Sequence, residues 1–163
     1  MSQSDSPPLE VGQIIPAFSL PGADGMPHSP WDYKQREHLV LLFLRSSATG
    51  ESRGLLREFS QYYSMFREEG CAILAVTPDT VITNLQTQEM LHLPFALLAD
   101  AGGTVIRRYI RWDETSRSYR PGIVLADRYN SMYAQWVADN EGELPSIEEL
   151  LESLRYLNKL CTP

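Results

Sequence analysis

The chain has 163 residues, of which 43% are hydrophobic and 21% are charged. This length corresponds to a single domain, because domains contain roughly 150 residues, and the composition excludes a disordered or fibrous protein. The net charge of -7 would repel nucleic-acid phosphates and anionic lipid surfaces. We therefore predict that the partners of this protein include neither nucleic acid nor a membrane.

The cysteines, the histidines and the N-terminal residues indicate cellular location and ligand classes. Cys71 and Cys161 lie too far apart for a C-x-x-C redox pair, and the 3 histidines lack ligand spacing. We therefore predict no metal and no cofactor. Residues 1–10 lack the basic start and apolar core of a targeting signal. We predict a disordered leader over residues 1–10, one domain over residues 11–163 and a cytoplasmic location.

The first half of the chain predicts a loop, a buried strand and a helix. Glycines and prolines break residues 11–30, where only residues 17–20 could form a short strand. Residues 38–44 form a continuous apolar run, which is typical of a central strand covered on both faces of a parallel sheet. Apolar residues recur at helical spacing over residues 55–66, which predicts a helix of about five turns ending at Gly70.

The next segment repeats this strand and helix unit. Residues 71–76 predict a second strand, which stops at a Thr-Pro-Asp segment. Asp79 or Thr80 can then cap a helix. That helix carries the apolar residues Val81, Ile82, Leu85 and Leu91.

The remaining elements complete an α/β architecture. We expect a third short strand over residues 95–98, a short helix over residues 103–109, and an antiparallel hairpin of residues 123–126 and 132–137. An amphipathic helix follows, with Ser146 as its cap. This order predicts a central mixed sheet with helices on both faces, a three-layer α/β arrangement that the thioredoxin fold also has.

The loop over residues 45–54 is the first place to look for a site, because ligands bind beyond the carboxyl ends of parallel strands. Residues 50–54 fit the G-x-S-x-G pattern of a hydrolase nucleophile, with Ser52 at its centre. However, five residues separate the pattern from the strand, and His92 is the one histidine after Ser52. A serine hydrolase is therefore disfavoured, and a polar helix start is the simpler interpretation.

Several short motifs follow one another in an order found in one known family. They are Val11-Gly12, Pro16, Phe18, Leu20-Pro21, Gly25, Asp32-Tyr33, Leu74 to Asp79, Leu93 to Asp100, and Tyr109. On these motifs the chain resembles the peroxiredoxins of the alkyl hydroperoxide reductase and thiol-specific antioxidant (AhpC/TSA) family. The resemblance covers nearly the whole chain and implies a thioredoxin-like fold, an antioxidant redox role and a tendency to dimerise.

The resemblance also implies where the family's catalytic residues would fall. In that family a Thr-x-x-Cys motif before the first long helix supplies a thiolate that attacks peroxide, and a later arginine stabilises it. Thr49 matches the threonine, Ser52 the cysteine and Arg120 the arginine, with Arg111 and Arg117 as alternatives for the arginine. An alkanol is too weak an acid to replace a thiolate, so we predict no ordinary peroxidase activity.

Two interpretations of the remaining pocket stay open. A helix N-terminus, two hydroxyls and the cations Arg45, Arg53 and Arg120 would suit a small anion or an oxygen-rich, peroxide-like ligand. Alternatively, the two hydroxyls only cap the helix, and Arg120 pairs with an acidic neighbour such as Glu51.

A second class of function is a thiol-dependent antioxidant oxidoreductase that uses Cys71 or Cys161 in an atypical way. We expect Cys71 to be buried at the start of a strand. Cys161 is expected to be exposed and mobile enough to form a mixed or intermolecular disulfide. The family likeness and the many aromatic residues predict a homodimer, although Tyr62 and Phe66 are expected to be core residues.

Overall fold

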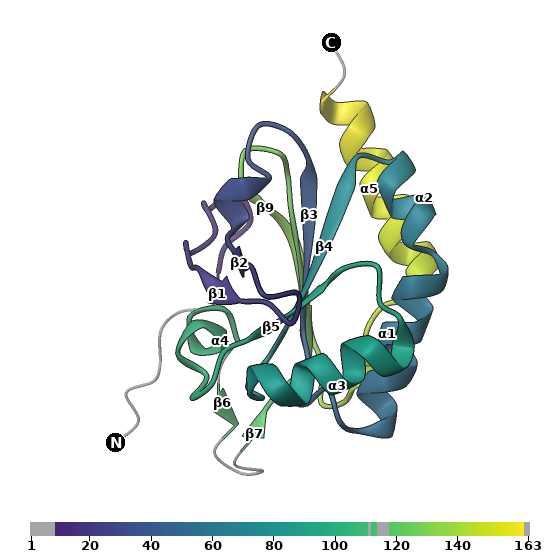
Figure 1. The fold of residues 1–163 in the computed structure, drawn as a ribbon. Coiled ribbons are helices and arrows are strands. Elements are labelled where there is room, and N and C mark those ends of the chain that lie inside the picture. The colour runs from purple at the N-terminus through teal and green to yellow at the C-terminus, as the bar shows by residue number, and fades with distance from the viewer. Residues whose placement is uncertain (1–8, 111, 114–117, 162–163) are drawn as a thin grey trace.

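The computed structural model describes residues 9–110, 112–113 and 118–161 (Figure 1). Its main sheet has 5 strands in the order β5-β4-β3-β8-β9. The strands are β3 (His38–Phe43), β4 (Cys71–Thr77), β5 (Ala96–Ala99), β8 (Gly122–Ala126) and β9 (Met132–Val137). β3, β4 and β5 run parallel, whereas β8 is antiparallel to both β3 and β9. The predicted central strand and the predicted hairpin are therefore confirmed.

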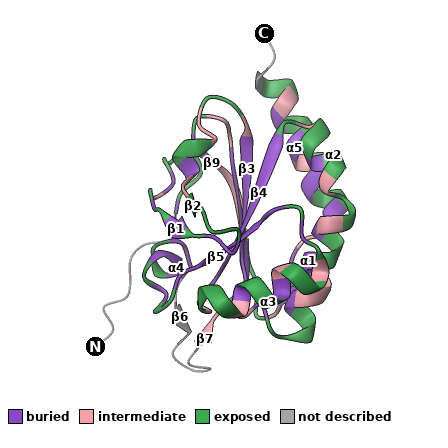
Figure 2. Cartoon of the chain, viewed as in Figure 1, coloured by how far each residue is buried: buried purple, intermediate pink, exposed green. Residues whose placement is uncertain are grey.

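The continuous apolar sequence of β3 reflects its cover on both faces. Every residue of β3 and β4 is buried, and both strands are coloured as buried along their length (Figure 2). Successive side chains of a strand point to opposite faces, so Val40 and Leu42 join one core cluster. Leu39, Leu41 and Phe43 join the other cluster.

Helices cover both faces, which confirms the predicted three-layer arrangement. The first face carries α1 (Gly50–Gln61), α2 (Tyr63–Glu68) and α5 (Ile147–Cys161), whose apolar side chains share one core cluster. The second face carries α4 (Thr104–Tyr109) and the N-terminal segment. Ser146 caps α5 as predicted, because its hydroxyl accepts a hydrogen bond from the Glu149 N–H at 3.2 Å.

The first helical region differs from the prediction of one continuous helix. Tyr62 has φ -103° and ψ 12°, so it separates α1 from α2. Phe66 is fully buried, but Tyr62 is 41% exposed. The prediction that Tyr62 is a core residue is therefore wrong. The helix is interrupted at this residue, and the ring lies at the surface.

The N-terminal segment corrects one prediction. The strand expected over residues 17–20 is absent, and β1 (Leu20–Pro21) instead pairs with β2 (Pro27–His28) in a short hairpin. Leu9 is buried, and its carbonyl accepts a hydrogen bond from Gln135. Residues 1–8 of the predicted leader lie outside the described residues.

The helix α3 (Val81–Leu91) packs with a polar face inward. Its buried residues are Asn84 and Thr87, whereas Ile82 is 70% exposed. The Asn84 side chain accepts a hydrogen bond from the Thr77 hydroxyl at 2.8 Å, and the Thr87 hydroxyl donates to the Ser47 carbonyl at 3.0 Å. These buried hydrogen bonds orient α3 toward the loop after β3, since unpaired polar groups would be costly there.

A small additional ribbon was not predicted. It consists of β6 (Trp112–Asp113) and β7 (Ser118–Tyr119), which pair antiparallel between α4 and β8. The short helix predicted over residues 103–109 is confirmed as α4, with Gly103 at φ 73° before its first turn. A side chain at Gly103 would collide with the Tyr119 hydroxyl, so this close approach requires glycine.

Candidate functional site

The loop between β3 and α1 is held by the carboxylate of Asp79, which follows β4. Asp79 accepts hydrogen bonds from the Ser47 N–H at 2.7 Å, the Ser47 hydroxyl at 3.1 Å and the Ser46 hydroxyl at 3.1 Å. The carboxyl ends of β3 and β4 lie side by side in the parallel sheet, which brings these residues together. Hydrogen bonds to a carboxylate are among the stronger ones in proteins, so Asp79 fixes the start of the loop.

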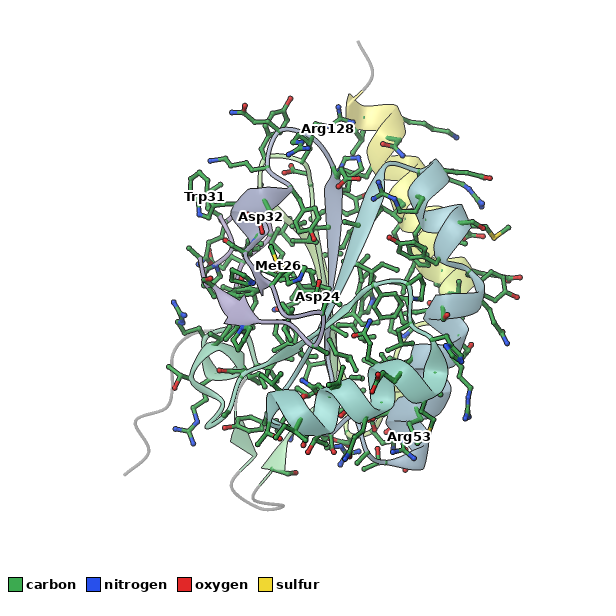
Figure 3. All side chains as sticks on the ribbon, viewed as in Figure 1. Asp24, Met26, Trp31, Asp32, Arg53 and Arg128 are labelled. Atoms are coloured by element: carbon green, nitrogen blue, oxygen red, sulfur yellow. The ribbon has the colours of Figure 1, made fainter. Side chains whose placement is uncertain are left out.

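Further contacts hold the middle of the loop against α3 and α1. The Ser47 carbonyl accepts hydrogen bonds from the Thr87 hydroxyl and from Arg53 Nε, the latter at 3.3 Å. Figure 3 labels Arg53 at the end of the molecule where α1 begins. The guanidinium of Arg53 is thus engaged with the loop backbone, in contrast to the prediction that it is available to an anion.

Thr49 is the N-cap of α1, as the helix-cap interpretation expects. Its hydroxyl accepts a hydrogen bond from the Ser52 N–H at 3.2 Å. An N-cap hydroxyl satisfies one of the free N–H groups of the first helical turn. The same hydrogen bond holds the backbone of Ser52 in place at the beginning of the helix.

The Ser52 side chain points to a carboxylate rather than to a cation. Ser52 is fully buried, and its hydroxyl donates a hydrogen bond to Glu141 Oε2 at 2.9 Å. Glu141 is 6% exposed and begins the short 3₁₀ helix η2 (Glu141–Glu143) after β9. The other carboxylate oxygen, Oε1, accepts a hydrogen bond from Arg45 Nη2 at 3.3 Å. Glu141 therefore links the other two side chains, and its carboxylate faces the guanidinium of Arg45.

Arg120 lies just before β8, in the region the resemblance implies. Its Nε atom is 3.7 Å from Asp139 Oδ1, and its side chain is 48% exposed. The acidic neighbour of Arg120 is therefore Asp139 rather than the expected Glu51. The alternatives Arg111 and Arg117 lie outside the described residues.

The hollow beside α1 is acidic. It measures about 240 Å³ and is bordered by carboxylates and by glycines of the first turn of α1. Its lining residues are Gly50, Glu51, Gly54, Leu55, Glu58, Glu141 and Gly142. Carboxylates repel a small anion, so the charge at this position does not match the anionic ligand that the arginine count suggested.

The thiol of Cys71 is unsuited to redox chemistry. It is fully buried at the start of β4, as predicted, and burial raises its pKa far above the ordinary value for a thiol. Only the thiolate is nucleophilic, so this thiol is inert near neutral pH. Cys161 ends α5, but its side chain lies outside the described residues, and its expected exposure stays a prediction.

Two further structural tests concern metals and membranes. Within the described residues, no cluster of 3 or more His, Cys, Asp or Glu side chains could hold a metal ion. None of the described helices has both the length and the apolar character of a membrane span.

Sequence reasoning missed Glu141 and did not foresee the role of Asp79 in the loop. Glu141 lies 89 positions after Ser52 in an acidic, glycine-containing turn that looks like any solvated loop. A signal for Asp79 was present, because a carboxylate directly after a buried parallel strand will face the loop that follows its neighbour. No comparable local signal marks Glu141.

Comparisons with known proteins support the resemblance seen in the sequence. The family model described as the AhpC/TSA family matches residues 11–144. The peroxiredoxin Bcp of Bacillus subtilis is 30% identical over 92 residues, which are 56% of this chain and 58% of that protein. A bcp protein of Coxiella burnetii is 28% identical over 101 residues, 62% of this chain and 66% of that protein. The matched region thus spans less than two thirds of the length of these curated relatives.

Solved structures show the same fold over almost all of the chain. The peroxidoxin BcpB of Mycobacterium tuberculosis matches with a TM-score of 0.79 at 18% identity, covering 91% of this chain and 98% of that one. The AhpC of Enterococcus faecalis matches with a TM-score of 0.82 at 16% identity, covering 92% and 93%. With the family match, these likenesses lead to one conclusion: the chain belongs to the AhpC/TSA family and has the thioredoxin-like fold of the peroxiredoxins.

Proposed function

We propose that this chain is a binding member of the AhpC/TSA family that does not reduce peroxides through the loop between β3 and α1. Ser52 stands in place of the peroxidatic cysteine in this proposal, with Thr49 beside it. The observation that carries the proposal is the hydrogen bond from the buried Ser52 hydroxyl to Glu141. A carboxylate at this distance favours a neutral hydroxyl donor and opposes an anion at the same position.

The same geometry narrows the class of ligand for this loop. Arg45 is neutralised by Glu141, Arg53 donates to a main-chain carbonyl, and Arg120 pairs with Asp139. The cations that were expected to attract an anion are therefore engaged with the protein itself. A neutral, oxygen-rich ligand of peroxide-like polarity fits this loop better than a small anion does.

The alternative function, a thiol-dependent oxidoreductase, depends on Cys161. Cys71 is disfavoured by its burial and by the raised pKa of its thiol. No structural feature of the described residues favours the alternative over binding.

Peroxide consumption tests both functions. Purified protein with excess dithiothreitol is compared with Cys71→Ser and Cys161→Ser variants and with a peroxidase-active peroxiredoxin as a positive control. We expect no consumption above the uncatalysed rate in any of the three chains. Turnover that disappears in Cys161→Ser would instead establish the oxidoreductase function and refute the proposal.

The predicted homodimer and cytoplasmic location are also retained as proposals. β9 is the outer strand of the sheet. The N-terminal segment bonds to its first residue, Met132, whereas Val137 at its other end is 45% exposed, so the later part of this edge is the candidate surface for pairing. Light scattering during size-exclusion chromatography would show a mass near twice the 18.5 kDa of the chain if the homodimer forms.

A further inference from the structure

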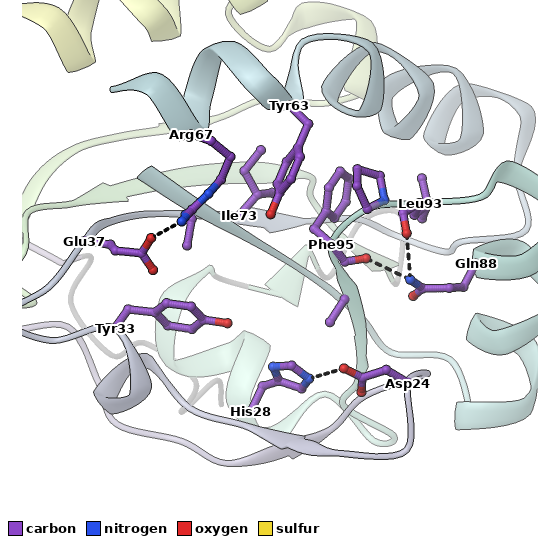
Figure 4. Close-up of a pocket in the computed structure, with 13 residues that line it drawn as sticks. Asp24, His28, Tyr33, Glu37, Tyr63, Arg67, Ile73, Gln88, Leu93 and Phe95 are labelled. Carbon is purple, nitrogen blue, oxygen red and sulfur yellow. Dashed lines mark hydrogen bonds and ion pairs between the residues drawn. The ribbon is translucent and has the colours of Figure 1, made fainter. Parts of the chain in front are cut away.

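A pocket lies beside the amino end of β4, away from the loop that contains Ser52. It measures about 380 Å³, which is within the range of small-molecule sites. β5 pairs with β4 only from Leu74 onward, so Cys71, Ala72 and Ile73 have no strand partner on the β5 side. The N-terminal segment and α2 form the walls above this part of β4 (Figure 4).

The floor and one wall of the pocket are apolar and preformed. Ile73 and Phe95 line it, and the Phe95 ring lies 6.0 Å from the ring of Tyr63. Gln88 holds the adjoining segment, because its amide donates to the carbonyls of Leu93 and Phe95 at 3.2 Å and 2.9 Å. The Gln88 carbonyl also accepts a hydrogen bond from the Leu97 N–H at 3.1 Å. A wall fixed in this way needs little reorganisation to accept a ring.

The charged groups of the pocket are already paired. Arg67 contacts the carboxylate of Glu37 at 2.5 Å, and it also donates to the Cys71 carbonyl at 3.2 Å. On the opposite side, His28 Nε2 lies 2.8 Å from Asp24 Oδ2. Arg67 and Glu37 neutralise each other, and the Asp24 carboxylate already accepts a hydrogen bond from His28, so each charged group has a partner within the protein. Desolvating a charged ligand here would therefore cost more than the contacts return.

Two phenol hydroxyls of the pocket have no such partners among the described residues. The hydroxyls of Tyr33 and Tyr63 point into the space between the N-terminal segment and α2 (Figure 4). Within the described part of the chain, neither hydroxyl forms a hydrogen bond. Burial, together with nearby Asp32 and Glu37, raises the pKa of Tyr33, so its phenol remains a hydrogen-bond donor across the physiological range.

The main chain of β4 adds a third donor on the same side. The His38 N–H donates to the Gly70 carbonyl, and the Leu44 N–H donates to the Val76 carbonyl. These two hydrogen bonds show which residues of β4 face β3. In a parallel ladder, alternate residues bond to opposite neighbours. Ile73 therefore directs its N–H away from β3, toward the edge that the pocket occupies.

We propose that this pocket binds a small, uncharged aromatic compound carrying a carbonyl oxygen. The proposal rests on the part of β4 that β5 does not pair with, on the partnered charged groups, and on the two phenol hydroxyls that lack a partner. The ring of this compound packs against the apolar surface that Tyr63, Phe95 and Ile73 form. Its oxygen accepts hydrogen bonds from the hydroxyls of Tyr33 and Tyr63 and from the Ile73 N–H. This site does not depend on the chemistry proposed for Ser52, because it uses none of the same residues.

Prodan, an uncharged aromatic ketone whose emission shifts in an apolar environment, is a suitable probe. We expect saturable binding to the full chain, with a Kd that rises about threefold to tenfold in Tyr33→Phe and in Tyr63→Phe, since each change removes one hydrogen bond. Tyr129→Phe is the matched control, because Tyr129 is 55% exposed and lies outside the pocket. Naphthoate, an anionic ring compound, should compete only weakly.

Two measurements can overturn this inference. The absence of saturable prodan binding refutes it, as does a Kd that is unchanged in the Tyr33→Phe, Tyr63→Phe double variant. The amide resonance of Ile73 should shift during the titration in a nitrogen-proton correlation spectrum. Shifts confined to residues outside the pocket would likewise refute the proposed site. Urea unfolding of each variant confirms that the fold is retained.

Discussion

At the carboxyl end of β3, Ser52 and Arg45 both bond to Glu141. At the amino end of β4, in contrast, the hydroxyls of Tyr33 and Tyr63 face an open pocket. Both regions combine buried backbone, hydroxyls and ion pairs on the same sheet. They differ in whether the uncharged polar groups have partners within the protein. Polar groups that satisfy one another stabilise the fold, whereas those left unpaired are available to a ligand.

Removing the carboxylate of Asp79 is expected to give the largest change in stability. Asp79→Ala leaves the Ser47 N–H and the hydroxyls of Ser46 and Ser47 without their acceptor. We expect a loss of about 2 to 3 kcal/mol in the free energy of unfolding, measured by urea denaturation. Glu89→Ala, on the exposed side of α3, is the control and should change the value little. A loss below about 1 kcal/mol in Asp79→Ala would mean that the loop does not depend on this network.

Replacing Ser52 by cysteine tests whether Glu141 suppresses thiol chemistry. In Ser52→Cys, the carboxylate of Glu141 should raise the pKa of the introduced thiol and slow its alkylation by iodoacetamide. Adding Glu141→Gln should accelerate alkylation near neutral pH by about tenfold, because a neighbouring negative charge shifts a pKa by about one unit or more.

The matched control for this experiment is Ser52→Cys with Glu143→Gln. Glu143 is exposed in the same 3₁₀ helix and accepts a hydrogen bond from Asn140 rather than from Ser52. Alkylation should remain slow in this control. Equal rates in the two double variants would show that net charge, and not the buried contact with Glu141, governs the thiol.

A third polar cluster, formed by His38 and Asn158 at the amino end of β3, is expected to make the stability of the fold depend on pH. Burial lowers the pKa of His38 below its ordinary value of 6.5, and His38 Nε2 bonds to Asn158 Oδ1 at 2.8 Å. The unfolded chain therefore binds a proton at a higher pH than the folded chain does. The stability associated with His38 is fully present above about pH 6.5 and declines as the pH falls below that value.

Urea unfolding at different pH values measures this effect. Between about pH 7.5 and pH 5.5 we expect the wild-type chain to lose about 1 kcal/mol more than His38→Gln, whose amide can still donate to Asn158. Parallel pH profiles for the two chains would show that the imidazole is not responsible.

The smallest effects compare single hydroxyl groups in the two regions. Thr87→Val removes the donor to the Ser47 carbonyl and should cost about 1 kcal/mol of unfolding free energy. Tyr33→Phe and Tyr63→Phe should each change that value by less than about 0.5 kcal/mol, because these hydroxyls bond to no described residue. Similar losses in all three variants would remove the distinction between the paired hydroxyl at the loop after β3 and the unpaired hydroxyls of the pocket.

Helix α3 shows why part of the fold was predictable while the packing of one helix was not. The sequence predicted the strand and offered Asp79 or Thr80 as the helix cap; the structure confirms the strand and has Thr80 as the cap. Which face of α3 is buried was not visible, because Asn84 and Thr87 bond to Thr77 and Ser47. Hydrophobic periodicity does not predict a buried polar face that is held by hydrogen bonds to residues elsewhere in the chain.

Local patterns determined most elements, because strand burial and helix capping depend on residues close together in sequence. The apolar run of β3, the Ser146 cap of α5 and the family motifs were all read in this way. Only the tertiary structure decided what surrounds Ser52, since Glu141 reaches it from 89 positions away through the return of the chain after β9. Contacts of this kind depend on how the elements pack, and packing is set by the whole sheet rather than by neighbouring residues.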